Sequence, residues 1–198
     1  MTDRAERRRA VAAAGHQADR EAARAGLSDP DPSVRATAIG AVERLGVLEA
    51  ADLDGALRDA SVTVRRRAIE ACAARPGDEP PSLIDALADD NPTIAEVAAW
   101  ASGERQPPEA GVVAVLAALV ADHADALVRE AAVAALGAIG DERGRAAILA
   151  ALGDKATVRR RAVLALAPFE GPDIDAALAS AKEDRDWQVR QAAEDLSR

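Results

Sequence analysis

The sequence predicts an all-α fold, an α-solenoid of about six stacked helix pairs. Three observations indicate this class: an apolar composition almost without aromatics, a motif that recurs about every 30 residues, and capping residues at matching places. Of the 198 residues 49% are hydrophobic, yet the aromatic residues are only Trp100, Phe169 and Trp187. A core of Ala, Leu, Val and Ile favours closely packed helices, because alanine is the best helix former and strands favour aromatic and β-branched residues.

The recurring motif begins at a Val or Ile that opens a predicted helix, which we call the anchor. The anchors are Val34, Val64, Ile94, Val128, Val158 and Val189, so their spacings are 30, 30, 34, 30 and 31 residues. The hexapeptide Thr-Val-Arg-Arg-Arg-Ala occurs twice, at 63–68 and 157–162. A fixed period of this length is typical of repeat arrays, in which each repeat is one supersecondary unit.

Local chemistry supports a helix at each anchor. The residues three positions earlier are Asp31, Ser61, Asn91, Asp125, Lys155 and Asp186, and all but the lysine are good N-caps. The anchor and the residues at +4, +7 and +8 from it are apolar, which predicts one buried helix face. Glycines stand at plausible C-cap positions near the ends of four units, at Gly46, Gly77, Gly140 and Gly171.

A further helix is expected before each anchor helix, and its apolar residues are clear in four units. They are Leu53, Ala56, Leu57; Leu83, Ile84, Leu87; Ile148, Leu149, Leu152; and Ile174, Ala177, Leu178. We therefore predict a single domain over 1–198. Its expected parts are an N-terminal capping helix at about 1–15 and repeats at about 16–46, 47–77, 78–106, 107–140, 141–171 and 172–198.

The third and fourth repeats are separated by four extra residues, within the segment GERQPPEAG at 103–111. Pro107 and Pro108 should end a helix and stiffen the connection. We therefore predict a change of superhelical twist at this junction.

The pattern D-P-D-x-x-V-R-x-x-A-x-x-A-[VL]-x-x-[LI]-G stands whole at 29–46 and in part in the other units. It resembles the HEAT repeat, most closely the short phycobilisome-lyase-type repeat, over roughly residues 16–198. The resemblance implies a right-handed, armadillo-like superhelix with an Asp–Arg ladder. The implied pairs are Asp29/Arg35, Asp59/Arg65, Asp154/Arg159 and Asp184/Arg190, with Arg129 near Asp122. Ala95 replaces the arginine in the third repeat, so the ladder should be weaker there.

The resemblance also implies that the anchor helices line a concave surface, where positions +2, +3 and +6 are exposed. The candidate partner-binding residues on this surface are Arg66, Arg67, Glu70, Glu96, Trp100, Glu130, Arg160, Arg161 and Gln191. Arginines and carboxylates balance in this stripe, and Arg and Trp are frequent at interface hot spots. We therefore expect a non-catalytic scaffold or adaptor that binds a protein or peptide partner.

Several of these features also have a purely structural interpretation. The arginine doublets could simply be solvated, Trp100 could pack across the insertion, and Trp187 could cover the edge of the last repeats. Cys72 lies at a core position and is expected to be inert. The run at 111–121 is apolar all round, which predicts burial, with an outer-face contact or a dimer as the alternative.

Catalytic signatures are missing from the sequence. It has no Gly-rich phosphate loop, no G-x-S-x-G and no Tyr, so we predict that the protein is not an enzyme. The His-Glu pairs of metal-binding HEAT-like hydroxylases are also missing, and His16 and His123 have no suitably spaced ligands. We expect no metal and no other cofactor.

The single cysteine, the charged N-terminus and the lack of an apolar run of about 20 residues predict a cytoplasmic protein without a membrane contact. It should be a monomer or a weak dimer. The alternative function is nucleic-acid binding, in a manner similar to the HEAT-repeat DNA glycosylases that remove alkylated bases. In that case Trp100 and the arginine doublets would contact DNA, with Glu96 or Glu130 as the catalytic carboxylate. The net charge of −9 and the balanced stripe make nucleic acid an unlikely partner.

Overall fold

The computed structural model of the protein describes residues 3–73 and 81–197, and in these ranges its regular secondary structure is helical. The chain divides into two compact units, Met1–Ser82 and Leu83–Arg198, which we call unit 1 and unit 2 and describe separately. Gly77, which the sequence placed at a helix end, lies outside the described residues. The predicted all-α solenoid class is confirmed.

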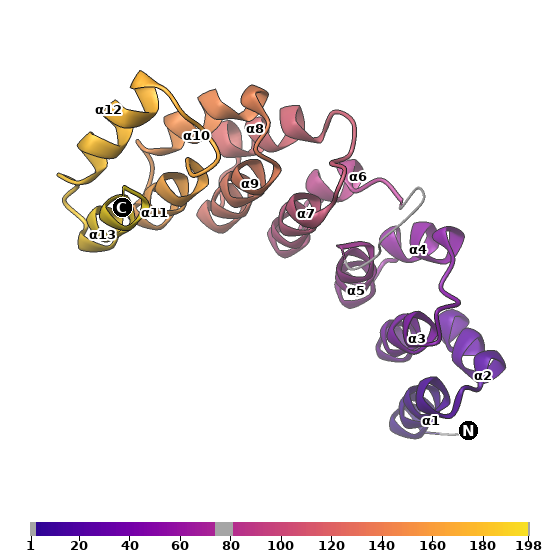
Figure 1. The fold of residues 1–198 in the computed structure, drawn as a ribbon. Helices are drawn as coiled ribbons and strands as arrows, with labels where there is room; N and C mark the ends of the chain where they lie inside the picture. Colours follow the sequence, from indigo (N-terminus) through magenta and orange to yellow (C-terminus); the bar gives the residue numbers. More distant parts are fainter. Residues whose placement is uncertain (1–2, 74–80, 198) are drawn as a thin grey trace. The chain divides into compact units, whose positions relative to one another are not determined.

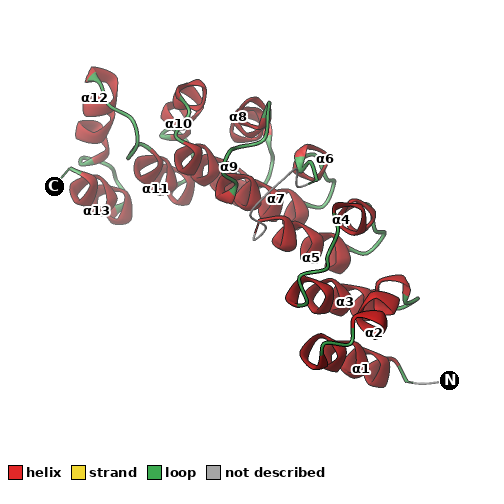
Figure 2. Ribbon diagram, turned by 45° about the vertical axis from the view of Figure 1, so that its right-hand side comes forward, coloured by secondary structure: helices red, strands yellow, loops and turns green. Residues whose placement is uncertain are grey.

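Unit 1 contains two layers of helices (Figures 1 and 2). One layer holds α1 (Arg4–Gln17), α3 (Pro32–Arg44) and α5 (Val62–Ala73), and α3 packs against both others. The second layer holds α2 (Arg20–Ala25) with the 3₁₀ turn η1 (Gly26–Ser28), and α4 (Ala50–Leu57). Each anchor therefore lies on the second helix of a helix pair.

Unit 2 repeats this arrangement. Its second helices are α7 (Pro92–Glu104), α9 (Ala126–Ile139), α11 (Ala156–Ala165) and α13 (Trp187–Leu196), and each packs on the next. Its first helices are α6 (Ile84–Leu87), α8 (Val112–Asp122), α10 (Arg145–Ala151) after the turn η2 (Glu142–Gly144), and α12 (Pro172–Ala181). We call α3, α5, α7, α9, α11 and α13 the second helices.

The capping residues act largely as predicted. The carboxylates of Asp31, Asp125 and Asp186 accept the N–H two residues on at 2.9, 2.8 and 2.9 Å, and Asn91 does the same at 3.0 Å. Lys155 makes no such bond. Gly46 and Gly140 have positive φ angles of 67° and 66° at helix ends, whereas Gly171 proves to be the N-cap of α12 rather than a C-cap.

The buried face of the second helices is wider than predicted. The anchor and positions +4, +7 and +8 are buried in α3, α5, α7 and α9. Position +5 is buried as well, at Ile39, Ile69, Ala99, Val133 and Val163. The additional burial arises because a second helix packs against both its own first helix and neighbouring second helices. For the same reason Ala192, expected to be exposed, is buried among Val163, Ala181 and Val189.

The prediction that the apolar run at 111–121 is buried all round is wrong. Within α8 the buried residues are Val112, Val113, Leu116 and Val120. Ala114, Ala118 and Ala121 are exposed, because α8 packs inward on α9 and turns its other face outward.

Glycine–alanine contacts set the close approach of several second helices. A Cβ atom on Gly103 would lie 2.9 Å from the Cα of Ala135, and one on Gly137 would lie 2.6 Å from the Cα of Ala165. Gly15 of α1 would meet Ala41 of α3 in the same way, at 2.9 Å. The N-terminal helix thus packs on α3 as one second helix packs on another.

Candidate functional site

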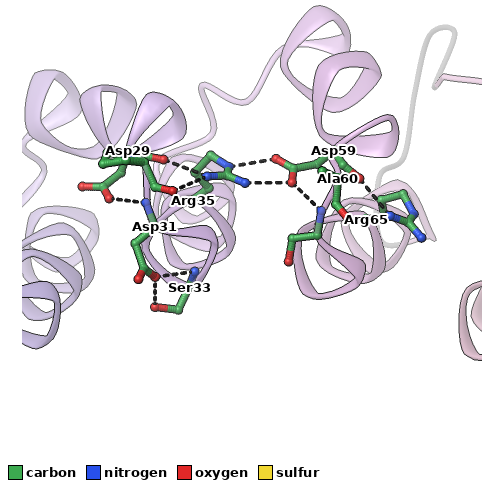
Figure 3. Close-up of polar contacts among 9 residues, drawn as sticks. Asp29, Asp31, Ser33, Arg35, Asp59, Ala60 and Arg65 are labelled. Carbon is green, nitrogen blue, oxygen red and sulfur yellow. Dashed lines mark hydrogen bonds and ion pairs between the residues drawn. The ribbon is translucent and has the colours of Figure 1, made fainter.

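An Asp–Arg ladder connects the repeats, but with a different pairing from the one expected (Figure 3). The Nε and Nη2 of Arg35 donate to the carboxylate of Asp59 in the following repeat, both at 2.8 Å. Its Nη1 donates to the backbone carbonyl of Asp29, in its own repeat, at 2.9 Å. Asp59 Oδ1 also accepts the N–H of Ser61 at 2.8 Å. A ladder arginine therefore donates to a backbone carbonyl in the turn of its own repeat and to the aspartate carboxylate in the turn of the next repeat.

The same pattern recurs along the chain. Arg7 pairs with Asp29, Arg129 with Asp154 and Arg159 with Asp184, with Nε–Oδ2 distances of 2.7, 2.6 and 2.8 Å. The expected carboxylate pairs Asp29/Arg35 and Asp154/Arg159 are wrong. Arg129, expected near Asp122, bonds to the backbone carbonyl of the adjacent His123 at 2.7 Å and takes Asp154 as its carboxylate partner. Arg65 and Arg190 use Nη1 to reach the backbone carbonyls of Asp59 and Asp184. The extended side chain at +1 reaches past its own turn to the next one.

The ladder perturbs the titration of its members. Hydrogen bonds from the arginine side chains lower the pKa values of Asp29, Asp59, Asp154 and Asp184, although burial opposes this shift. The arginines Arg7, Arg35, Arg129 and Arg159 show raised pKa values, chiefly through the same bonds. These pairs are structural, since each is used to connect neighbouring helix pairs.

The ladder lacks an Arg–Asp pair between α7 and the turn before α9, and both residues of this rung are replaced. Ala95 of α7 stands where the ladder has arginine, and it is fully buried. In the next repeat His123 occupies the aspartate position, five residues before the anchor, and its Nδ1 accepts the N–H of Asp125 at 3.1 Å. The imidazole thus reproduces the turn-stabilising bond of the aspartate. Sequence reasoning noted Ala95 and overlooked His123, although its spacing from Val128 was visible.

The candidate arginines of unit 1 have partners within the fold. Arg66 donates to Glu70 of the same helix at 2.9 Å. Arg67 forms an ion pair with Glu43 of α3 and lies 3.7 Å from Glu70. Its guanidinium also covers Gly40. Arg67 therefore connects α5 to α3 and is not simply solvated.

The candidate residues of unit 2 lie on successive second helices. Glu96 and Trp100 are on α7, Glu130 is on α9, and Gln191 is on α13. Arg161 of α11 pairs with Glu130 at 3.4 Å, and Gln191 donates to Asp195 at 3.0 Å. Arg160 is exposed and makes no ion pair within the described ranges. Among the three arginines on α11, Arg159 pairs with Asp184 and Arg161 with Glu130, so Arg160 is the one whose charge no carboxylate of the described residues offsets.

Large exposed apolar side chains are concentrated on the same helices. Trp100, Leu127, Leu164 and Trp187 are 46%, 58%, 38% and 64% exposed, and they belong to α7, α9, α11 and α13. Leu127 directly precedes its anchor, where four other repeats have Ser or Thr. That difference was a signal that sequence reasoning missed. We call Trp100, Leu127, Leu164, Trp187 and the half-buried Ala131 and Ala134 of α9 the apolar surface of unit 2.

Other parts of unit 2 present fewer side chains that could bind a ligand. A shallow cavity of about 480 Å³ is lined by residues of α8 and α10, mostly alanines, and by the ladder pair Arg129–Asp154. Across residues 3–73 and 81–197, no cluster of three or more His, Cys, Asp or Glu side chains could hold a metal ion. None of the described helices is long and apolar enough to cross a membrane.

Comparison with known families identifies the class of protein. The family profile for HEAT repeats matches residues 53–137, 80–167 and 113–197, which together run over most of the chain. The chain therefore belongs to the HEAT-repeat family. None of the curated proteins compared with it matches.

Solved structures with the same fold include designed and natural proteins. A designed armadillo repeat protein in complex with the peptide (KR)4 is 20% identical, with a TM-score of 0.66 over 88% of this chain and 96% of that one. The Escherichia coli protein YibA is 20% identical, with a TM-score of 0.70 over 94% and 70%. Human deoxyhypusine hydroxylase is 20% identical, with a TM-score of 0.51 over 98% and 78%. At these identities the likeness shows the fold alone.

Proposed function

We propose that the protein is a non-catalytic interaction scaffold that binds a protein partner on the apolar surface of unit 2. One observation carries the proposal: all four large apolar side chains that are prominently exposed in the described residues stand on second helices of this unit. Exposed apolar groups gathered on one surface mark interaction sites, and tryptophan is enriched at binding hot spots.

The surroundings of this surface support a protein partner. Ala131 and Ala134 are short side chains on α9, which lies between α7 and α11 with their larger exposed side chains. An extended segment could therefore lie across the helices. One solved structure with the same fold is of a designed protein in complex with a peptide. Arg66, Arg67 and Glu70 of unit 1 are kept as further candidate contacts.

The test is capture of partners from the source cells by the purified protein, followed by mass spectrometry. A variant with Trp100→Ala, Leu127→Ala and Leu164→Ala should retain wild-type helicity and lose the captured partner. Ala118→Glu, at an exposed position of α8 on the outer layer, is the matched control and should capture normally. Loss of capture in the control alone would move the site to the outer layer and refute the proposal.

Three finer expectations stay predictions. From the motif at 29–46 we expect the repeats to be of the phycobilisome-lyase type. A cytoplasmic location and a monomeric or weakly dimeric state follow only from composition.

A further inference from the structure

We infer that α7 recognises a lysine or arginine side chain of the partner, held over Trp100 between the carboxylates of Glu96 and Glu104. The inference rests on the proposed function and specifies the chemistry of its partner. It concerns unit 2 alone.

The three side chains form a column on one helix face. Glu96, Trp100 and Glu104 are spaced four residues apart, so each carboxylate lies about one turn from the indole. Trp100 is 46% exposed. In the part of the chain that the structure describes, neither glutamate has a basic group within 4.0 Å. The column is an exposed aromatic ring flanked by two uncompensated negative charges.

Three other glutamates on second helices have an arginine partner. Glu43 pairs with Arg67, Glu70 with Arg66, and Glu130 with Arg161. The fold thus offsets these three carboxylates with arginines but leaves the pair beside Trp100 without one. Glu194 of α13 also lacks an arginine partner in the described residues, but α7 combines two such glutamates with an exposed tryptophan one turn from each, and a cation from outside could contact all three there.

The helix itself adds to the negative potential. Glu104 is the last residue of α7, whose final turn contains no basic residue. A carboxylate at a helix C-terminus is unfavourable, because the helix dipole is negative there. The adjacent Arg105 is buried, and its guanidinium pairs with Glu109 at 3.2 Å. A cation bound between Glu96 and Glu104 would relieve this repulsion and could also lie against the indole face, where cation–π attraction applies.

The apolar surface suggests how the segment continues. Trp100 and Leu164 both stand at position +6, on α7 and α11, with α9 between them. Neighbouring helix axes are about 8–10 Å apart, so the two side chains are separated by roughly 16–20 Å. An extended chain covers that distance in about five or six residues. We therefore expect a basic residue and an apolar residue at about that spacing, the apolar one over Leu164.

The test measures binding of a fluorescently labelled (KR)4 peptide by anisotropy at about 100 mM salt. Wild-type protein should bind it, and a labelled Gly-Ser peptide of equal length should not bind. Trp100→Ala and the double variant Glu96→Gln/Glu104→Gln should each raise Kd about tenfold, as expected for losing a partly desolvated cation contact. Circular dichroism checks that both variants keep their helicity.

A matched control separates this site from general attraction of a polycation to an acidic protein. Glu183→Gln/Glu194→Gln removes two exposed carboxylates of unit 2 that lie outside the column on α7 and outside the apolar surface. This variant should change Kd by less than about twofold, since it leaves the column on α7 intact. Equal effects of the test and control variants would overturn the inference.

Failure of the cation site can be distinguished from failure of the proposed scaffold function. Capture of a cellular partner that depends on Leu164 but not on Glu96 and Glu104, together with no binding of (KR)4, would sustain the scaffold and refute the cation site. In an NMR spectrum of the wild-type protein, a shift of the indole N–H resonance of Trp100 on addition of (KR)4, without a shift for Trp187, would support both the scaffold and the cation site.

Discussion

Arg35 shows at the residue scale what the ladder contributes. Its guanidinium makes two charge-assisted bonds to Asp59 and one to a backbone carbonyl, and its side chain is only 21% exposed. Hydrogen bonds to charged groups are worth more than surface ion pairs, because partial burial reduces the competition from water.

Arg35→Ala should therefore destabilise the protein by about 1–3 kcal/mol. Arg143→Ala is the matched control: this arginine pairs with Asp141 but is 75% exposed, so the change should cost less than about 0.5 kcal/mol. Urea unfolding followed by circular dichroism measures both. Similar losses for the two variants would show that the ladder is no stronger than a surface pair.

The ladder also gives a prediction for pH. Because the folded pKa values of Asp29, Asp59, Asp154 and Asp184 are lowered, their contribution to stability is present above the ordinary aspartate pKa of about 3.9. It is lost as the pH falls through the lowered values. The difference in Tm between wild type and Arg35→Ala/Arg159→Ala should therefore be large at pH 7 and at least halved at about pH 2.5. A difference that is independent of pH would contradict the assignment.

Two glycines give opposite expectations for the same substitution. Gly137→Ala places a Cβ 2.6 Å from the Cα of Ala165, so α9 and α11 must move apart. We expect a loss of about 1–3 kcal/mol, as for other overpacked sites. Gly55→Ala in α4 meets no atom within 4 Å and should stabilise by about 0.5–1 kcal/mol, because alanine is the better helix former. Thermal unfolding compares the two, and stabilisation by both would mean that α9 and α11 do not touch at Gly137.

At the scale of elements, the junction of α7 and α9 is where the repeat pattern changes. The arginine and aspartate of one rung are replaced together by Ala95 and His123, and Gly103 brings α7 against the backbone of α9. Apolar contact thus takes the place of an ion pair at this junction. The expected change of twist there stays a prediction.

A double-mutant cycle tests this interpretation. Ala95→Arg should destabilise by burying a cation without a partner, and His123→Asp should leave a carboxylate without its arginine. Together they rebuild the rung, so the coupling free energy should be favourable by about 1–2 kcal/mol. Chemical denaturation of the four proteins gives this value. Additive changes would show that α7 and α9 leave no room for a rung.

At the scale of the whole molecule, the charges bear on the alternative of nucleic-acid binding. Three of the four candidate arginines are paired with carboxylates, and the net charge is −9. We expect no shift of a labelled DNA duplex at about 50 mM salt, where phosphate contacts would be strongest. A salt-dependent shift that Arg160→Ala weakens would favour the alternative instead.

Much of the architecture could be predicted from the sequence. The helix pairs, the N-caps such as Asp31 and the buried anchors such as Val34 follow from local periodicity and capping chemistry. The candidate site was predicted less well. Exposure of Leu127 and the paired state of Arg67 both depend on which residues a neighbouring helix presents, and a repeat pattern averages over such differences.

The sequence by itself determined the class of fold, the period of the repeat and the burial of the anchors, because these depend on interactions within about one turn of helix. Only the tertiary structure decided which carboxylate each ladder arginine meets. Arg35 bonds to Asp59 rather than to the carboxylate of Asp29 because its extended side chain spans two stacked turns. In the same way, packing between repeats gives Glu130 an arginine partner but gives none to the half-buried Glu96 or the exposed Glu104 beside Trp100.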